Sequence, residues 1–153
     1  MGVYWGRRAY LQAKALLGEP YVWGGEGAHG DDCSGLAQWA YSEVGIPIAR
    51  TTFEQYREYP VTAPFANGDL LFFRGSDPGP NGEPGHVGFF AGYGVIAANQ
   101  HSWAGTGNPN SGHLIILNAP YTGDPGGIRF DYAALIGPVV AHTRPGNARK
   151  DPA

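Results

Sequence analysis

The stretch GDDCSGLAQWAY, residues 30–41, contains the single cysteine of the chain and marks a change from loop to helix. Glycine and aspartate precede Cys33, and the apolar spacing of a helix follows it. A thiol at such a point lies near the positive end of a helix dipole, among backbone N–H groups that have no partner within the helix. This setting favours the thiolate, which is the nucleophilic form. We therefore predict a nucleophile at Cys33, the alternative being a buried cysteine that only fills space.

Composition limits the classes of protein that this chain can represent. A length of 153 residues suits one domain with a substantial core, expected over residues 1–143 and followed by a polar tail or truncated linker at 144–153. The net charge is −3, and no basic run is longer than two residues, as in the terminal Arg149-Lys150, so neither nucleic acid nor an anionic membrane surface is an expected partner. One cysteine excludes an intrachain disulfide and a thiolate zinc cluster. We expect a monomer with no metal and no cofactor.

The sequence carries no recognisable export or membrane signal. No stretch approaches the about 18 apolar residues that span a bilayer, and the N-terminus lacks the apolar core of a signal peptide. We expect synthesis in the cytoplasm and delivery by another route if the target lies outside the cell. A phage lysis or tail protein, or a secreted effector, would fit this expectation.

Hydrophobic periodicity predicts helices first and strands afterwards, and therefore an α+β domain whose N-terminal helices pack on an antiparallel sheet. The tight sequence Gly92-Tyr93-Gly94 is interpreted as a hairpin turn between two short strands. The segments 102–112 and 118–130 are rich in Gly, Pro, Asn and Asp, and are predicted to be loops. The predicted helices cover residues 3–17, 32–45 and 51–58, and the predicted strands cover 69–74, 86–91, 95–98, 113–117 and 137–141.

A cysteine nucleophile needs a base, which is commonly an imidazole. Among the five histidines, His86 is the best candidate because it opens a predicted strand directly after Gly85. Gly88 leaves open space on the same face of that strand. We predict that His86 is the general base.

Four motifs occur in a fixed order: YVWGG at 21–25, DCSGL at 32–36, GDLLFF at 68–73 and GHVG at 85–88. In this order they resemble the NlpC-type cell-wall cysteine peptidases. The resemblance implies a compact papain-like fold with a central antiparallel sheet of about five or six strands. It also implies cleavage of the peptide stems of bacterial peptidoglycan, typically between γ-D-glutamate and diaminopimelate.

The resemblance also implies roles for individual residues. Cys33 would be the nucleophile and His86 the general base, with backbone N–H groups at the start of the Cys33 helix forming part of an oxyanion hole. Tyr21, Asp32 and Ser34 match positions at the reacting centre or the substrate groove. Tyr21 could instead be an ordinary core tyrosine, and Asp32 could cap the helix.

One position departs from the family pattern. The family places a polar residue about twelve positions after its catalytic histidine to orient the ring, and here Ala98 occupies that position. Strand parity then favours Gln100, because side chains of one face recur at every second residue. A shifted register would present Asn99 or His101 instead. A backbone carbonyl or a water molecule is the remaining alternative for orienting His86.

These observations predict a cysteine endopeptidase that acts on peptidoglycan stem peptides. Two alternatives use the same Cys–His pair, namely an amidase of the CHAP type that cuts the glycan–peptide link and an acyltransferase. A third alternative is a catalytically weak peptide-binding module, which Ala98 suggests.

Overall fold

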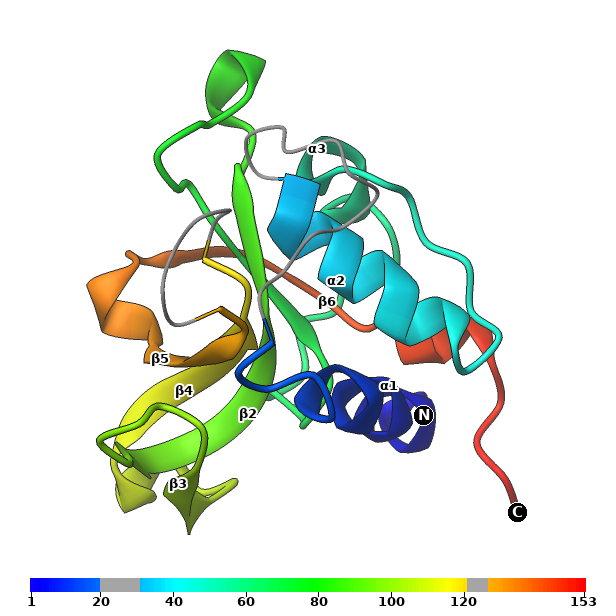
Figure 1. The fold of residues 1–153 in the computed structure, drawn as a ribbon. Helices are drawn as coiled ribbons and strands as arrows, with labels where there is room; N and C mark the ends of the chain where they lie inside the picture. Colours follow the sequence, from blue (N-terminus) through cyan, green and yellow to red (C-terminus); the bar gives the residue numbers. More distant parts are fainter. Residues whose placement is uncertain (20–30, 121–126) are drawn as a thin grey trace.

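The computed structural model describes residues 1–19, 31–120 and 127–153, except for the side chains of Asp31 and Asp32. Within these residues the chain forms an α+β domain, with helices in its N-terminal part and a sheet after them (Figure 1). The helices α1 (Val3–Lys14), α2 (Asp31–Ser42) and α3 (Thr52–Gln55) lie where the sequence predicted them. In the described part of the chain, no helix has both the length and the hydrophobicity to cross a membrane.

Within residues 1–19, 31–120 and 127–153 the sheet has six strands, and every pair of neighbouring strands is antiparallel. Its order is β5-β4-β2-β1-β6, and β3 also pairs with β2. The strands are β1 (Leu70–Phe73), β2 (His86–Ile96), β3 (Trp103–Thr106), β4 (His113–Asn118), β5 (Arg129–Tyr132) and β6 (Val139–Thr143). This confirms the predicted fold class.

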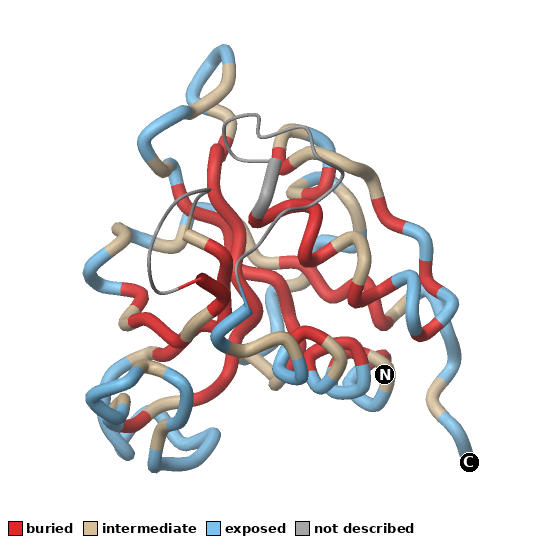
Figure 2. The backbone as a smooth tube through the Cα atoms, viewed as in Figure 1, coloured by how far each residue is buried: buried red, intermediate tan, exposed pale blue. Residues whose placement is uncertain are grey.

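Both faces of the sheet are covered, which explains why the central strands read as continuous apolar runs (Figure 2). All four residues of β1 are fully buried. Leu70 and Phe72 belong to the large cluster that includes residues of α1 and α2. Leu71 and Phe73 belong to a smaller cluster with Ile116 of β4. The period of two along β1 therefore fills two cores at once.

The predicted turn at Gly92-Tyr93-Gly94 is wrong, because β2 continues straight through it to Ile96. The glycines instead allow the backbones of β2 and β3 to approach each other closely. A Cβ on Gly94 would lie 2.0 Å from the carbonyl oxygen of Ala104 in β3, and one on Gly105 would lie 2.0 Å from that of Tyr93. The hairpin therefore joins β2 to β3, with its connection at residues 97–102.

Two segments that were expected to be irregular are ordered against the rest of the molecule. The strand β5 begins inside the predicted loop 118–130, at Arg129, and pairs with β4. The predicted tail packs back on α1: the Trp5 indole donates to the carbonyl oxygen of Lys150 at 2.9 Å. The Arg149 guanidinium lies 3.7 Å from the centre of the Trp5 ring. A side-chain stack and hydrogen bonds decide this placement, which composition alone does not reveal.

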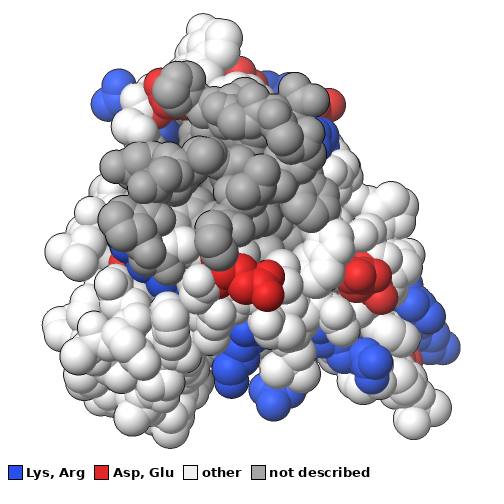
Figure 3. Space-filling view, in the orientation of Figure 1, with Lys and Arg blue, Asp and Glu red and all other residues white. Residues whose placement is uncertain are grey.

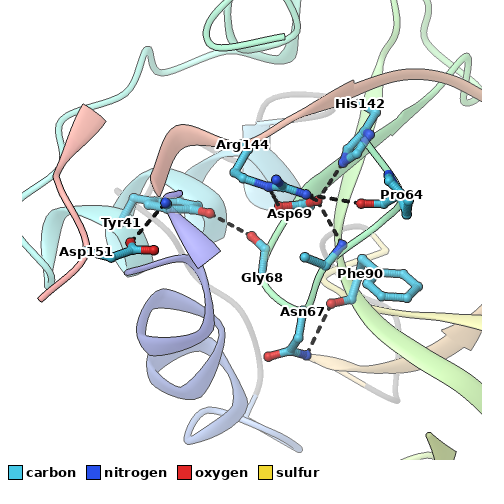
Figure 4. A network of polar contacts seen from close by, with 11 residues as sticks. Tyr41, Pro64, Asn67, Gly68, Asp69, Phe90, His142, Arg144 and Asp151 are labelled. Carbon is cyan, nitrogen blue, oxygen red and sulfur yellow. Dashed lines mark hydrogen bonds and ion pairs between the residues drawn. The ribbon is translucent and has the colours of Figure 1, made fainter. Parts of the chain in front are cut away.

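A buried polar cluster joins the start of β1 to the end of β6 (Figure 4). The Asp69 carboxylate accepts hydrogen bonds from Arg144 Nε at 2.8 Å and Arg144 Nη2 at 3.0 Å. His142 Nε2 lies 2.6 Å from the same carboxylate, and the Ala66 backbone N–H donates to it at 2.9 Å. Asp69 is 1% exposed, so its charge is neutralised inside the protein rather than by water.

Candidate active site

Cys33 is the third residue of α2, and its side chain is buried. It belongs to the hydrophobic cluster that also contains Val87, the neighbour of His86 on β2. The helix α2 packs against β2, and Figure 1 shows both elements beginning in the upper half of the view. The fold therefore brings the helix start that carries Cys33 and the strand start that carries His86 to the same end of the domain.

His86 is the first residue of β2, opposite Phe73 of β1. Its side chain is buried, and its Nε2 atom lies 2.8 Å from Oδ1 of Asn118. Burial lowers the pKa of His86, while the hydrogen bond with Asn118 and the charge of Asp131 act in the opposite direction without cancelling the effect. The neutral imidazole, which can accept a proton, is consequently the favoured form near pH 7.

Asn118 is the last residue of β4, and strand register brings it to His86. The pairing of Phe89 with Leu117 sets Asn118 opposite Gly88 on the neighbouring strand. A Cβ on Gly88 would lie 3.3 Å from Cβ of Asn118. Two side chains of β4, Ile116 and Asn118, therefore fill the open space that the sequence indicated beside Gly88.

The sequence selected Gln100 to orient His86, but the structure places Asn118 in contact with the ring instead. The Gln100 side-chain amide donates to Asp131 Oδ1 at 2.9 Å and to the Phe130 carbonyl oxygen at 3.3 Å. The reason is the β3 hairpin, which occupies the chain after β2 and makes β4 the neighbour of the His86 end of β2. The sequence feature that could have indicated Asn118 is the apolar run of β4, which ends in this polar residue.

The side-chain amide of Asn118 has acceptors on its other side as well. Its Nδ2 atom donates to Asp131 Oδ2 at 2.9 Å and to the Arg129 carbonyl oxygen at 3.3 Å. Asp131 Oδ2 also accepts a hydrogen bond from Arg129 Nε at 3.1 Å. A connected chain of polar contacts thus runs from His86 through Asn118 to Asp131, across strands β2, β4 and β5.

The three residues expected at the substrate groove have different outcomes. Ser34 is fully buried, its hydroxyl accepts a hydrogen bond from Arg50 Nη1 at 3.1 Å, and its carbonyl oxygen accepts one from Gln55. Ser34 therefore supports the start of α2 from inside and presents no accessible surface to a substrate. Tyr21 and the side chain of Asp32 lie outside the described residues, so their roles stay predictions.

A pocket of about 490 Å³ lies elsewhere, between α1 and the β2–β3 hairpin. Arg7, Tyr10 and Trp103 are among its lining residues, but Cys33 and His86 are not. In Figure 3 basic side chains gather along the lower edge of the molecule, where α1 lies in Figure 1. This pocket is separate from the Cys33 and His86 positions.

Residues 18–119 of this chain match the NlpC/P60 family. The chain belongs to this family. The match begins at residue 18, after the end of α1, and reaches the residue after Asn118, so it includes Cys33, His86 and Asn118. The family resemblance drawn from the four sequence motifs is thereby confirmed.

Curated members of the NlpC/P60 family resemble this chain over about half of its length. The bifunctional muramidase/DL-endopeptidase CwlT of Bacillus subtilis is 38% identical over 98 residues, which are 60% of this chain and 28% of CwlT. The murein DD-endopeptidase MepH of Escherichia coli is 42% identical over 84 residues, which are 51% of this chain and 30% of MepH. The aligned segments thus account for less than a third of each relative.

Solved NlpC/P60 structures share the fold. The P60 domain of an antigen from M. avium subspecies paratuberculosis has a TM-score of 0.61 at 23% identity, covering 94% of this chain and 96% of that domain. NlpC2 from Trichomonas vaginalis has a TM-score of 0.63 at 25% identity, covering 92% of this chain and 46% of that protein. The likeness to the P60 domain extends over nearly its whole length, so the chain has the fold of one NlpC/P60 domain.

Proposed function

We propose that this NlpC/P60 domain is a cysteine endopeptidase that hydrolyses peptidoglycan stem peptides, with γ-D-glutamyl-diaminopimelate as the bond cut. Cys33 acts as nucleophile, His86 as general base and Asn118 as the residue that orients the His86 ring. The observation that carries the proposal is the buried contact of 2.8 Å between His86 Nε2 and Asn118 Oδ1. A buried imidazole held by an amide oxygen is suited to general-base chemistry.

The Asn118 contact selects one tautomer of His86. An amide oxygen can only accept, so the proton on the neutral ring resides on Nε2, the atom that faces Asn118. Nδ1 then keeps its lone pair for the Cys33 thiol proton. The lowered pKa of His86 supports this role because it keeps the ring in the accepting form.

The reaction proceeds in two steps, acylation and hydrolysis. In acylation, His86 Nδ1 takes the Cys33 thiol proton while Sγ forms a bond to the substrate carbonyl carbon. Backbone N–H groups in the first turn of α2 stabilise the oxyanion, and the proton on Nδ1 then passes to the leaving amine as the C–N bond breaks. In the second step water attacks the thioester carbonyl, His86 accepts a proton from the water, and Cys33 is released as a thiol when that proton returns to sulfur.

The two bacterial relatives support a peptide bond of the cell wall as the substrate. CwlT is named for a DL-endopeptidase activity and MepH for a DD-endopeptidase activity on murein. The two named activities cut different bonds, so the names of the relatives support both a bond within the stem and a bond of the cross-link as the substrate. Ala98 suggested a weak binding module because it leaves no polar side chain at the family's usual position. In the structure Asn118 supplies a polar partner for His86.

The test is digestion of purified diaminopimelate-type peptidoglycan by the wild-type chain and by Cys33→Ala, with products identified by mass spectrometry. We expect fragments that end in D-glutamate from wild type and none from Cys33→Ala. Intact free stems would identify the enzyme as an amidase instead of an endopeptidase. Cleaved cross-links would show that the bond cut is a cross-link and not the γ-D-glutamyl-diaminopimelate bond. Equal digestion by Cys33→Ala would remove Cys33 from the mechanism.

Asn118→Leu is expected to lower kcat by roughly 10- to 100-fold, because the ring of His86 loses a hydrogen bond worth about 1–3 kcal/mol. KM should change little, since Asn118 acts through His86. Steady-state kinetics on a soluble muropeptide measures both constants. The matched control is Asn67→Leu, which removes another side-chain amide, in the turn before β1, that donates to the carbonyl oxygens of Phe90 and Ala91. An equal loss of kcat in both variants would contradict a specific role for Asn118.

A further inference from the structure

The orientation of the Asn118 side chain is decisive, because its two ends have opposite effects on His86. With Oδ1 toward the ring, Nε2 of His86 carries the proton and Nδ1 is left as the base. With the NH₂ group toward the ring, Nε2 would have to accept, and the proton of a neutral ring would move to Nδ1. That tautomer cannot take a proton from a thiol at Nδ1. Some neighbour must therefore hold the amide in the productive orientation.

Asp131 is placed to do this. Its carboxylate Oδ2 lies 2.9 Å from Nδ2 of Asn118. An ionised carboxylate accepts hydrogen bonds and donates none, so it binds the NH₂ end of the amide and rejects the oxygen end. The Arg129 carbonyl oxygen, 3.3 Å from Nδ2, imposes the same preference more weakly. With both acceptors on one side, Oδ1 of Asn118 is directed to His86.

We propose that Asp131 is a positioning residue of the active site, which holds the Asn118 amide so that His86 carries its proton on Nε2 and exposes Nδ1 as the base. This inference rests on the proposed function, because it deepens the roles given there to His86 and Asn118. It extends the site to a fourth residue, on β5, that does not contact the His86 ring in any described hydrogen bond.

The carboxylate of Asp131 is itself held rigidly. Arg129 Nε donates to Oδ2 at 3.1 Å, and Gln100 Nε2 donates to Oδ1 at 2.9 Å. Asp131 is 7% exposed, so these contacts replace most of its water. The ion pair with Arg129 and the contact with Gln100 together fix where the two carboxylate oxygens lie. Gln100 therefore belongs to the same polar network, but three contacts separate it from His86, the residue that the sequence predicted it would orient.

The first experiment reads the His86 tautomer directly, without substrate. Two-bond ¹H–¹⁵N correlation NMR of the full chain labelled at histidine distinguishes Nε2–H from Nδ1–H, and a His86→Gln spectrum assigns the signal. We expect the Nε2–H form in wild type. Asp131→Asn can donate as well as accept, so we expect its spectrum to show a mixture of tautomers. Asp69→Asn is the control, because it alters a different buried carboxylate and should leave the His86 signal unchanged.

The second experiment separates positioning from a purely structural role, since Asp131 also ties β4 to β5. Asp131→Asn should lower kcat about 10-fold with KM unchanged. In the background of Asn118→Leu, the same change should have no further effect on kcat, because the amide that Asp131 orients is gone. A structural role would instead lower kcat again in the double variant.

Three results would overturn the inference: an Nδ1–H tautomer in wild type, an unchanged tautomer in Asp131→Asn, or additive kcat losses in the double variant. Failure of the proposed function is a different observation, namely that Cys33→Ala digests peptidoglycan as well as wild type or that wild type digests none. The NMR result does not depend on digestion, so the two failures are distinguishable.

Discussion

Cys33→Ala and His86→Ala are each expected to lower kcat/KM by at least about 10³-fold, the scale of losing a nucleophile or its base. Cys33 forms the bond to the substrate carbonyl, and water cannot take its place in the same geometry. His86 is buried beside Phe73, and its ring is hydrogen-bonded to Asn118. A water molecule in place of the ring would not be a base held in the same position. Initial rates on a soluble muropeptide measure both effects.

The double variant Cys33→Ala/His86→Ala should be no slower than Cys33→Ala alone, because the two residues act as one unit. His113→Ala is the matched control, because this imidazole is exposed on β4 and its ring lies against the Tyr132 ring, with 5.1 Å between the two ring centres. Its kcat/KM should stay close to wild type. Melting temperatures of all variants show whether the folded state survives. Losses that multiply in the double variant, or a folded His86→Ala with near-normal rate, would contradict the proposed pair.

Arg144→Met is expected to lower the free energy of unfolding by about 3–5 kcal/mol, as for other ion pairs that lose one buried partner. The substitution keeps the apolar stem but removes two hydrogen bonds to Asp69, whose carboxylate is 1% exposed. The remaining charge would then lie in the core without its main counter-charge. Urea unfolding followed by circular dichroism measures the loss, and the melting temperature should fall by on the order of 10 °C.

Acid unfolding gives an independent measure of the same cluster. Burial alone would raise the pKa of Asp69, but the hydrogen bonds with His142 and Arg144 outweigh it and hold the pKa below its usual 3.8. Protonation is therefore weaker in the folded than in the unfolded chain, so the stability from Asp69 is complete above about pH 3.8 and is lost as the pH falls through the folded pKa. Arg144→Met should move the acid midpoint to higher pH.

The control for Arg144 is Arg57→Met, which breaks an ion pair with Glu83 on the surface. The Arg57 side chain is 65% exposed, so water replaces the lost contact and the melting temperature should stay near wild type. Equal losses in the two variants would show that the position of an ion pair does not matter in this protein, against the expectation here.

Errors in the predicted secondary structure came from glycines and from short strands. Gly94 and Gly105 resemble turn residues in the sequence, yet each allows two paired strands to approach closely. The first two residues of β5 lie in a segment whose composition predicts a loop. Pairing with β4 stabilises β5, and a local sequence window does not contain that partner.

Sequence reasoning was sufficient to predict the α+β class, the helix start at Cys33, the strand start at His86 and the family. These features depend on local periodicity and on motifs whose residues lie close together in the chain. The residues that surround His86 depend instead on how distant strands pair in the folded chain. Asn118 is 32 residues away and Asp131 lies on the next strand, and both reach the site through the register of β2, β4 and β5. The register of these strands is set by the packing of the two faces of the sheet into the two hydrophobic clusters. A slip of β4 by one residue against β2 would turn Asn118 away from His86.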